Sequence, residues 1–357
     1  MGIQFSNEGI TDKVLELLNK TPEWAAIYAE YAEGIIKNQD DYKKARKFRV
    51  PNPLLCYSSI VKVKSKSPNK KYSLRYYGQE LATIIMNSNW KCPELSLTKT
   101  QASFLNTYIE KDGLEEGKKI AWHEEIANRI RSTMKNSKEK LKTHSPEHEK
   151  ESRLLYEFAN GKTLSDIQPV KLGGLFFQLT TPIKASDHKI GPQISLRKNN
   201  KGKYSSASGG GIDILARVKN HFGDNNSEFR LAIIELKDET KKSEPQRVVM
   251  QQALSYATFI VKLLRSESGV KWYNIFRDQK KKQNEVPKKL KIDVITLMPK
   301  DTKGEDEIGE LIPIKIGEDT LYPYTLYFDY NDKEKEFTFE GTFVNRDKDL
   351  FHNKVGL

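Results

Sequence analysis

Two stretches of this chain decide its fold: Gly211-Ile212-Asp213-Ile214-Leu215-Ala216-Arg217-Val218 and Phe229-Arg230-Leu231-Ala232-Ile233-Ile234-Glu235-Leu236-Lys237. Both are rich in the aliphatic and β-branched residues that fill core strands. The residues between them, 219 to 228, carry the Gly, Asn and Asp content of a turn. The two stretches are therefore predicted to form a β-hairpin, which can bring Asp213 and Glu235 together.

The polar residues of this hairpin suit a divalent cation. Side chains alternate between the faces of a strand, so Glu235 and Lys237 share one face and Leu236 occupies the other. Buried carboxylates are costly unless a cation neutralises them, and Mg²⁺ takes one or two carboxylates while keeping waters that phosphate oxygens can displace. Lys237 would position the attacking water and offset transition-state charge, which is the chemistry of phosphodiester hydrolysis. The alternative is a solvated strand face, on which Glu-x-Lys is common.

These residues resemble the PD-(D/E)XK nuclease superfamily, whose signature is an acid at the start of one strand and an (Asp/Glu)-x-Lys on the next. The first half here is Gly211-Ile212-Asp213, without the proline of the family name, and the second is Glu235-Leu236-Lys237. The resemblance implies an α/β fold with a restriction-endonuclease-like core, in which helices flank a mixed central sheet. It also implies that Asp213, Glu235 and the Leu236 carbonyl hold Mg²⁺, for which Mn²⁺ can substitute.

The resemblance extends to Gln252 and Tyr256, which are similar to the Gln-x3-Tyr element of RecB-like members. In those members the two residues lie on the helix after the catalytic strand and face the active site and the DNA. Gln252 and Tyr256 are four residues apart, hence on one helical face, and are expected to belong to the catalytic site. The alternative is an ordinary amphipathic helix with a half-buried tyrosine.

An upstream acid is also implied, because the superfamily usually opens its core with a helix that carries a metal-holding carboxylate. The segment 146–160 is the well-placed helix in this chain. Glu151 shares the helical face of its apolar residues and is therefore the expected additional metal ligand, although a structural role for it stays open.

The remaining pattern supplies an α-β-β-β-α-β order over 146–300, which a mixed sheet flanked by helices requires. The predicted elements are a strand at 175–183, a polar loop at 198–211, a helix at 248–265, a strand at 291–298 and a terminal hairpin formed by 322–330 and 336–344.

The first 145 residues have helical apolar spacing at 12–31, 78–87 and 121–141, interrupted by prolines and a lysine-rich run at 62–71. A chain of 357 residues exceeds what one core usually holds. We therefore expect a mainly helical domain at 1–145, which binds DNA or a partner, followed by a nuclease domain at 146–357.

Charge favours a polyanionic partner, because 60 Lys and Arg against 48 Asp and Glu give a net charge of +12. Basic runs at 62–66, 135–142 and 279–291 could follow DNA, but each alone is more typical of a solvated face. Cys56 and Cys92 do not form a metal cluster or a disulfide framework. Without an apolar stretch near 18 residues or a signal peptide, the protein is expected to be cytoplasmic, with no membrane partner.

The sequence therefore favours a Mg²⁺-dependent deoxyribonuclease, with restriction or defence as its setting by analogy with the family. Asp213→Ala or Lys237→Ala should abolish cleavage, and double-strand cutting would favour a homodimer with two active sites. Two alternatives stay open: a non-catalytic nucleic-acid-binding protein that keeps the nuclease fold, and a protein that docks on a partner. DNA against RNA, and ends against internal sites, also stay open.

Overall fold

The computed structural model describes residues 8–48, 54–58, 70–86, 93–109, 113–136, 146–161, 167–186, 193–196, 211–219, 229–238, 245–277, 282–302, 311–331 and 336–342. The chain forms two compact units. The first unit joins Met1–Ala32, Phe158–Val170 and Gln178–Leu357, and the second joins Glu33–Glu157 and Lys171–Phe177. These units differ from the expected domains at 1–145 and 146–357, because each is assembled from segments on both sides of that boundary.

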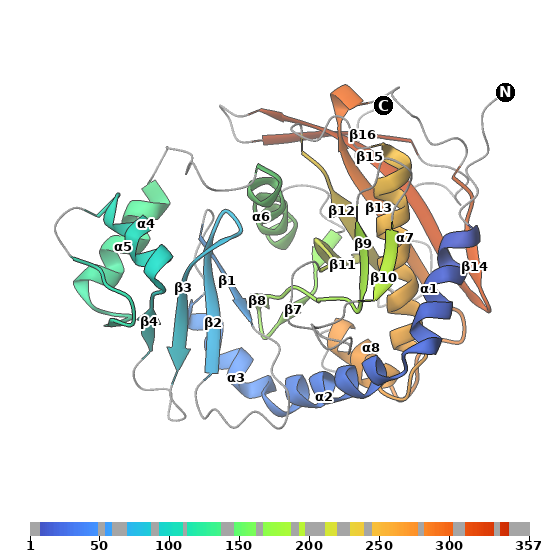
Figure 1. The fold of residues 1–357 in the computed structure, drawn as a ribbon, viewed down its shortest axis with the longest axis horizontal. Helices are drawn as coiled ribbons and strands as arrows, with labels where there is room; N and C mark the ends of the chain where they lie inside the picture. The colour runs from blue at the N-terminus through green and yellow to red at the C-terminus, as the bar shows by residue number, and fades with distance from the viewer. Residues whose placement is uncertain are drawn as a thin grey trace. The chain divides into compact units, whose positions relative to one another are not determined.

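A seven-stranded mixed sheet forms the centre of the first unit (Figure 1). Its strand order is β14-β15-β13-β12-β11-β6, with β16 paired to β15. Strands β12, β13 and β15 run parallel, and the other neighbours are antiparallel. The strands are β6 (Ile167–Pro169), β11 (Ile214–Lys219), β12 (Phe229–Leu236), β13 (Lys291–Pro299), β14 (Ile314–Ile316), β15 (Asp319–Asn331) and β16 (Glu336–Thr342).

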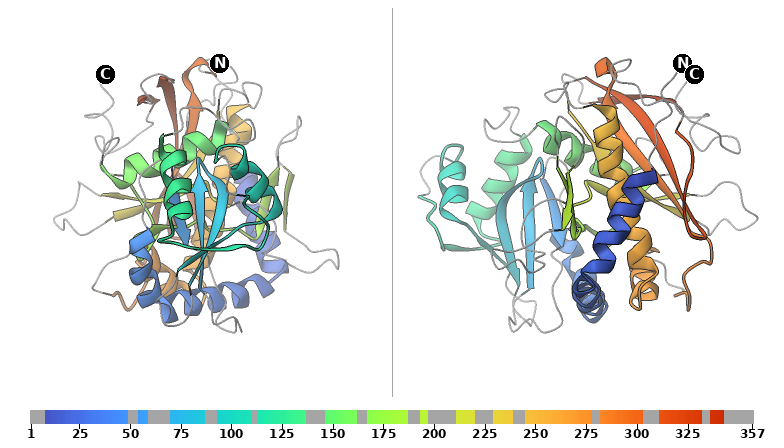
Figure 2. Two further views of the ribbon diagram at one scale, coloured as in Figure 1. Left: turned by 90° about the vertical axis from the view of Figure 1, so that its left-hand side faces the viewer. Right: turned by 45° about the vertical axis from the view of Figure 1, so that its right-hand side comes forward.

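Helix α7 (Gln246–Leu264) is the first of two helices between the parallel strands β12 and β13 and packs on the sheet, as Figure 1 shows. Most of its residues are buried, because α1 (Glu8–Lys20) and the strand β9 (Ile183–Ser186) also pack on it. The right-hand view of Figure 2 shows α1 beside α7. The same unit contains the start of α2 (Glu23–Lys37), α8 (Gly269–Arg277), the 3₁₀ turn η3 (Lys300–Thr302) and β10 (Gln193–Leu196), which pairs with β9.

Strand register shows which face of the sheet α7 covers. Val249 of α7 clusters with Met298 of β13 and Tyr327 of β15. Met298 is registered with Tyr327, and Leu236 is registered with Leu297, so Lys237 is level with Met298. Registered residues of neighbouring strands share a face, and alternate residues of one strand do so too. Helix α7 therefore covers the face of the sheet to which Glu235 and Lys237 belong.

The second unit is built on another seven-stranded sheet, with the order β5-β4-β3-β2-β1-β8-β7. Its strands are β1 (Leu54–Ser58), β2 (Lys70–Tyr76), β3 (Gln79–Met86), β4 (Glu94–Ser96), β5 (Lys119–Ala121), β7 (Lys171–Leu172) and β8 (Leu175–Phe176). Its helical elements are α3 (Gln39–Lys44), η1 (Ala45–Phe48), α4 (Lys99–Asn106), α5 (Glu125–Asn136) and most of α6 (Pro146–Ala159).

This sheet corrects the expectation of a mainly helical segment over 1–145. The expected helix at 78–87 is strand β3, which pairs with β2 through a turn at Tyr77 and Gly78. Both turn residues have positive φ, 45° and 80°, as the tight turns of two-residue hairpins require. The apolar residues of 81–86 fit an alternating pattern as well as a helical one, so local spacing did not distinguish the two.

The expected strand at 175–183 is also wrong. Leu175–Phe176 forms β8 in the second unit, Thr180 makes an isolated bridge to Gly211, and β9 begins at Ile183. Pro182, which cannot donate a ladder hydrogen bond, lies directly before the start of β9.

Other expected elements are confirmed: the β11–β12 hairpin, α6, α7, β13 and the β15–β16 pair. The expected loop at 198–211, apart from Gly211, and the basic run at 62–66 lie outside the described residues, as does most of the run at 135–142. Among the described helices, none is both long and apolar enough to cross a membrane.

Candidate active site

The β11–β12 hairpin places Asp213 opposite Glu235. Asp213 directly precedes β11, and Ile214 is registered with Ile234, so the next pair outward is Asp213 and Glu235. The Oδ2 atom of Asp213 accepts a hydrogen bond from the Leu236 main-chain N–H at 2.9 Å. This bond fixes the Asp213 carboxylate against the end of β12.

Glu235 and Lys237 form a buried ion pair. Their exposed fractions are 2% and 4%, and 3.4 Å separates Lys237 Nζ from Glu235 Oε1. Charged side chains of these types are almost never fully buried unless they are paired. The solvated strand face that the sequence left open is therefore excluded. Asp238 follows directly and is also buried, at 2% exposure. It was not among the predicted site residues, although it continues the Glu-Leu-Lys run.

The main chain of Leu236 faces the same edge as Asp213. In a strand, the N–H and C=O of one residue project to the same side, and successive residues alternate sides. Lys237 donates its N–H to Leu297 of β13 at 2.9 Å, while the Leu236 N–H points to Asp213. The Leu236 carbonyl is thus directed to the edge of β12 at which Asp213 lies.

Gln252 and Tyr256 lie on the sheet-facing side of α7. Tyr256 is seven residues, or about two turns, beyond Val249, which packs on Met298 and Tyr327. Gln252 Nε2 donates to Tyr256 Oη at 3.4 Å. Tyr256 is only 3% exposed, so it is not the half-buried tyrosine of an ordinary amphipathic helix. Gln252 Oε1 is buried and accepts no hydrogen bond from any described residue.

Glu151 is buried on α6, with 6% exposure, and belongs to the second unit. There its charge acts on Tyr57 of β1, whose pKa is raised first by burial and then by the negative charge of Glu151, while Arg75 opposes the rise. The sequence expectation that Glu151 joins Asp213 and Glu235 around one cation stays a prediction.

The opposite face of the first unit's sheet carries a second buried ion pair. Asp293 is fully buried, and its Oδ1 lies 3.7 Å from Arg230 Nη1. The Arg230 guanidinium also lies over the ring of Tyr322, 5.5 Å from its centroid. Register pairs Asp293 with Ala232, so this pair lies on the other face from Glu235. Asp293 interrupts an apolar strand, and this sequence signal could have predicted a buried ionic contact.

The donor set around Asp213 fits a magnesium site with few protein ligands. In the described part of the chain, no group of three or more His, Cys, Asp or Glu side chains is arranged to hold a metal ion. The protein donors that a cation at this edge could use are the carboxylates of Asp213 and Glu235 and the Leu236 carbonyl, with water in its other positions. That is the coordination that Mg²⁺ commonly adopts at phosphate-processing sites.

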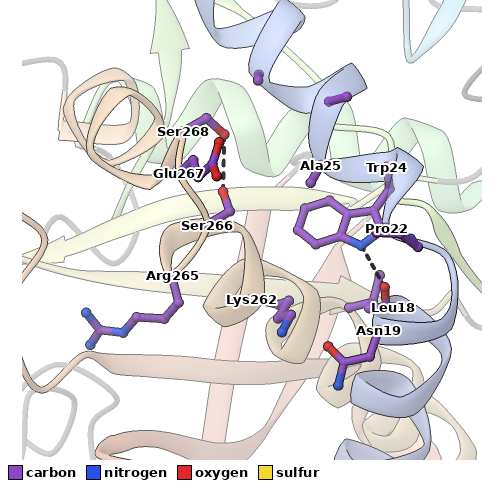
Figure 3. A pocket seen from close by; sticks show the side chains of 12 residues that line it. Leu18, Asn19, Pro22, Trp24, Ala25, Lys262, Arg265, Ser266, Glu267 and Ser268 are labelled. Carbon is purple, nitrogen blue, oxygen red and sulfur yellow. Dashed lines mark hydrogen bonds between the residues drawn. The ribbon is translucent and has the colours of Figure 1, made fainter.

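A separate cavity of about 490 Å³ lies where the α1–α2 turn meets the end of α7 (Figure 3). Trp24 forms an apolar wall and donates its indole N–H to the Leu18 carbonyl at 3.0 Å. On the polar side, the hydroxyls of Ser266 and Ser268 are 3.2 Å apart. None of the predicted site residues lines this cavity, so it is distinct from the candidate active site.

Comparison with known proteins identifies no relative: no family model, curated protein or solved structure matches this chain.

Proposed function

We propose that this protein is a metal-dependent nuclease that hydrolyses phosphodiester bonds of DNA. The observation that carries the proposal is the buried Glu235–Lys237 pair beside Asp213 at the end of a hairpin. A charged pair in this position is costly to bury. Its location at the carboxyl end of a parallel strand is where α/β proteins usually bind their ligands.

Asp213, Glu235 and the Leu236 carbonyl are the proposed metal ligands. Asp213 uses one lone pair of Oδ2 for the Leu236 N–H, and a carboxylate has further lone pairs to offer a cation. A bound Mg²⁺ or Mn²⁺ would supply charge that polarises the phosphate and lowers the pKa of a water molecule. Whether Glu151 contributes a further ligand is part of the proposal and has its own variant below.

Lys237 is proposed to hold the attacking water and to offset negative charge on the phosphate. Its ammonium group already lies against Glu235, so it is fixed before substrate binds and needs little reorganisation during the reaction. Gln252 and Tyr256 are proposed to contact the substrate from α7. The buried Gln252 Oε1 has no donor among the described residues, as expected of a group whose partner arrives with the substrate.

The net charge of +12 favours a nucleic acid as the substrate. We propose DNA, in a restriction or defence role, with a homodimer if both strands are cut at one position.

The test is to incubate purified wild type and Asp213→Asn with linear and circular plasmid in Mg²⁺, in Mn²⁺ and in EDTA, and to follow the DNA on gels. Asparagine keeps an oxygen that accepts the Leu236 N–H but removes the charge. We expect metal-dependent cleavage by the wild type only, and cutting of the circle would identify an endonuclease. Labelled RNA in parallel lanes decides between the two nucleic acids, and Glu151→Gln tests the additional ligand.

Asp293→Asn is the control for lost stability, because it neutralises a buried, paired carboxylate on the opposite face of the same sheet and should destabilise the unit without abolishing cleavage. Circular dichroism should show each variant folded before its activity is compared. Cleavage that persists in Asp213→Asn would contradict the proposed site. Intact DNA in every wild-type lane would instead favour the non-catalytic alternatives, which gel-shift measurements with the same DNA would then separate.

A further inference from the structure

The position of Asp213 depends on a short segment that runs beside the residues preceding it. Ile212 donates its N–H to the Leu179 carbonyl at 3.1 Å, and Thr180 forms an antiparallel bridge with Gly211. Gly211 is two residues before Asp213. The Leu179–Thr180 segment therefore fixes the main chain that leads directly to the Asp213 carboxylate.

Gly211 is required for this close approach. A Cβ atom at position 211 would lie 2.9 Å from the Leu179 carbonyl oxygen and 3.2 Å from Gln178 Cγ. The first of these contacts is with main chain, which cannot move aside as the end of a flexible side chain can. Any larger residue at 211 would separate the two segments and shift Asp213.

The pairing of Thr180 with Gly211 supplies no hydrogen-bond donor to the Thr180 carbonyl. Because the bond runs from Ile212 to Leu179, Thr180 and Gly211 face each other as a non-hydrogen-bonded pair, in which the carbonyl of Thr180 points away from Gly211. The hydroxyl of Tyr28 donates a hydrogen bond to that carbonyl. Tyr28 thus satisfies a main-chain acceptor that the short ladder cannot satisfy.

Tyr28 is itself held rigidly. It is fully buried, its ring lies edge-on to Phe259 of α7 with 5.0 Å between centroids, and its own carbonyl accepts the indole N–H of Trp272 at 3.0 Å. These contacts connect α2 to α7 and α8 within the first unit. A group anchored this firmly can determine where the Thr180 carbonyl lies.

We propose that Tyr28 is a positioning residue for Asp213, acting through Thr180 and Gly211. As a statement about catalysis, this inference rests on the proposed nuclease function. As a statement about geometry, it does not, because the Leu236 amide that donates to Asp213 reports the position of the carboxylate directly.

The experiment compares hydrogen exchange at the Ile212 and Leu236 amides in the wild type, Tyr28→Phe and Gly211→Ala. Tyr28→Phe keeps the aromatic packing and removes only the hydroxyl. We expect exchange at both amides to accelerate about tenfold, the effect of losing one buried hydrogen bond. The same variants should lower kcat for plasmid cleavage by a similar factor and raise the Mn²⁺ concentration for half-maximal rate, with KM for DNA unchanged.

Two matched controls separate positioning from general destabilisation. Thr258→Val removes another buried hydroxyl, which donates to the Leu254 carbonyl within α7 at 2.7 Å. Gly9→Ala adds a methyl group where nothing lies within 4 Å. Both should leave the two amides and kcat unchanged.

Each outcome decides one of the two proposals. Wild-type exchange rates at Ile212 and Leu236 in Tyr28→Phe would overturn the positioning role, even if the wild type cuts DNA. Faster exchange at both amides in a protein that cuts no nucleic acid would support the positioning role and count against the nuclease. If Thr258→Val loosens the same two amides equally, the effect is general and the inference fails.

Discussion

Replacing Lys237 by methionine should strongly destabilise the first unit near neutral pH. Methionine is about as long as lysine and is uncharged, so the change removes the ammonium group with little loss of packing. Lys237 is 4% exposed, and its Nζ lies 3.4 Å from Glu235 Oε1. The variant therefore leaves a carboxylate in a buried position without the cation that faces it.

The magnitude follows from the distance. At 3.4 Å and an effective dielectric constant of about 20, the attraction between two unit charges is roughly 5 kcal/mol. Removing one partner of a buried pair typically costs about 3–5 kcal/mol. We expect a loss in that range for Lys237→Met. The double variant Glu235→Leu with Lys237→Met, which removes both charges, should lie within about 1 kcal/mol of the wild type.

The assay is urea unfolding followed by hydrogen exchange of the β12 amides, which report the first unit alone. Measurements on the wild type, both single variants and the double variant form a complete cycle. Added Mn²⁺ should recover more stability in Lys237→Met than in the wild type, because the cation then replaces the ammonium group beside Glu235.

A cost below about 1 kcal/mol, the value of a surface pair, would refute the reasoning, because it would mean that water reaches Glu235. Equal costs for the single and the double variant would refute it differently, by showing that lost packing and not lost charge is responsible.

Three further predictions concern other residues. Asp213→Asn should reduce cleavage at least about 100-fold with little change in melting temperature. Asp213→Ala should also destabilise the protein by about 1–2 kcal/mol, because the Leu236 N–H loses its acceptor. Calorimetry and plasmid cleavage distinguish the two variants. Arg265 donates through Nε to Asp319 at 2.9 Å and also through Nη2. Arg265→Met should therefore lower the free energy of unfolding by about 1–2 kcal/mol, whereas Arg265→Lys should keep only part of that stability. Salt titration of the unfolding midpoint checks the charge contribution. Burial raises the pKa of the Cys56 thiol above its ordinary value of 9.0, so above pH 9 the folded state keeps the thiol proton while the unfolded state loses it. The contribution of Cys56 to stability is therefore complete below pH 9, and above it the free energy of unfolding falls by about 1.4 kcal/mol per pH unit. Cys56→Ala should reduce that slope by the same amount in alkaline unfolding curves.

Those parts of the fold that rest on local pattern could be predicted from the sequence. The aliphatic run Leu231–Ile234 has the character of a strand that is buried on both faces, and β12 is such a strand, with α7 on one face. Because α7 follows β12 and precedes a second apolar strand, the parallel β12–α7–β13 arrangement follows from order alone. The opposition of Asp213 and Glu235 follows from the hairpin register.

The parts of the fold that could not be predicted depend on contacts between residues that are distant in the sequence. Tyr28 and Thr180 are separated by 152 positions, and nothing near Tyr28 distinguishes it from any other apolar residue of an amphipathic helix. The separation of 175–183 into a strand of one unit and a bridge of the other is equally invisible locally. In β3, apolar residues at 81, 82, 84, 85 and 86 satisfied the helical and the alternating pattern together, and pairing with β2 decided between them.

The two buried ion pairs of the first unit's sheet show why position carries the functional argument. Arg230–Asp293 is near the amino ends of β12 and β13, and an aromatic ring lies against its guanidinium. That end of the strands is opposite to the carboxyl ends at which α/β proteins usually bind their ligands. Glu235–Lys237 is at the carboxyl end of β12, beside the start of β11, where a second acid is held against a main-chain amide. A structural pair gains nothing from that second acid, because two neighbouring carboxylates repel each other. A divalent cation would remove the repulsion, and this is the physical reason for which we propose Asp213 and Glu235 as the metal ligands.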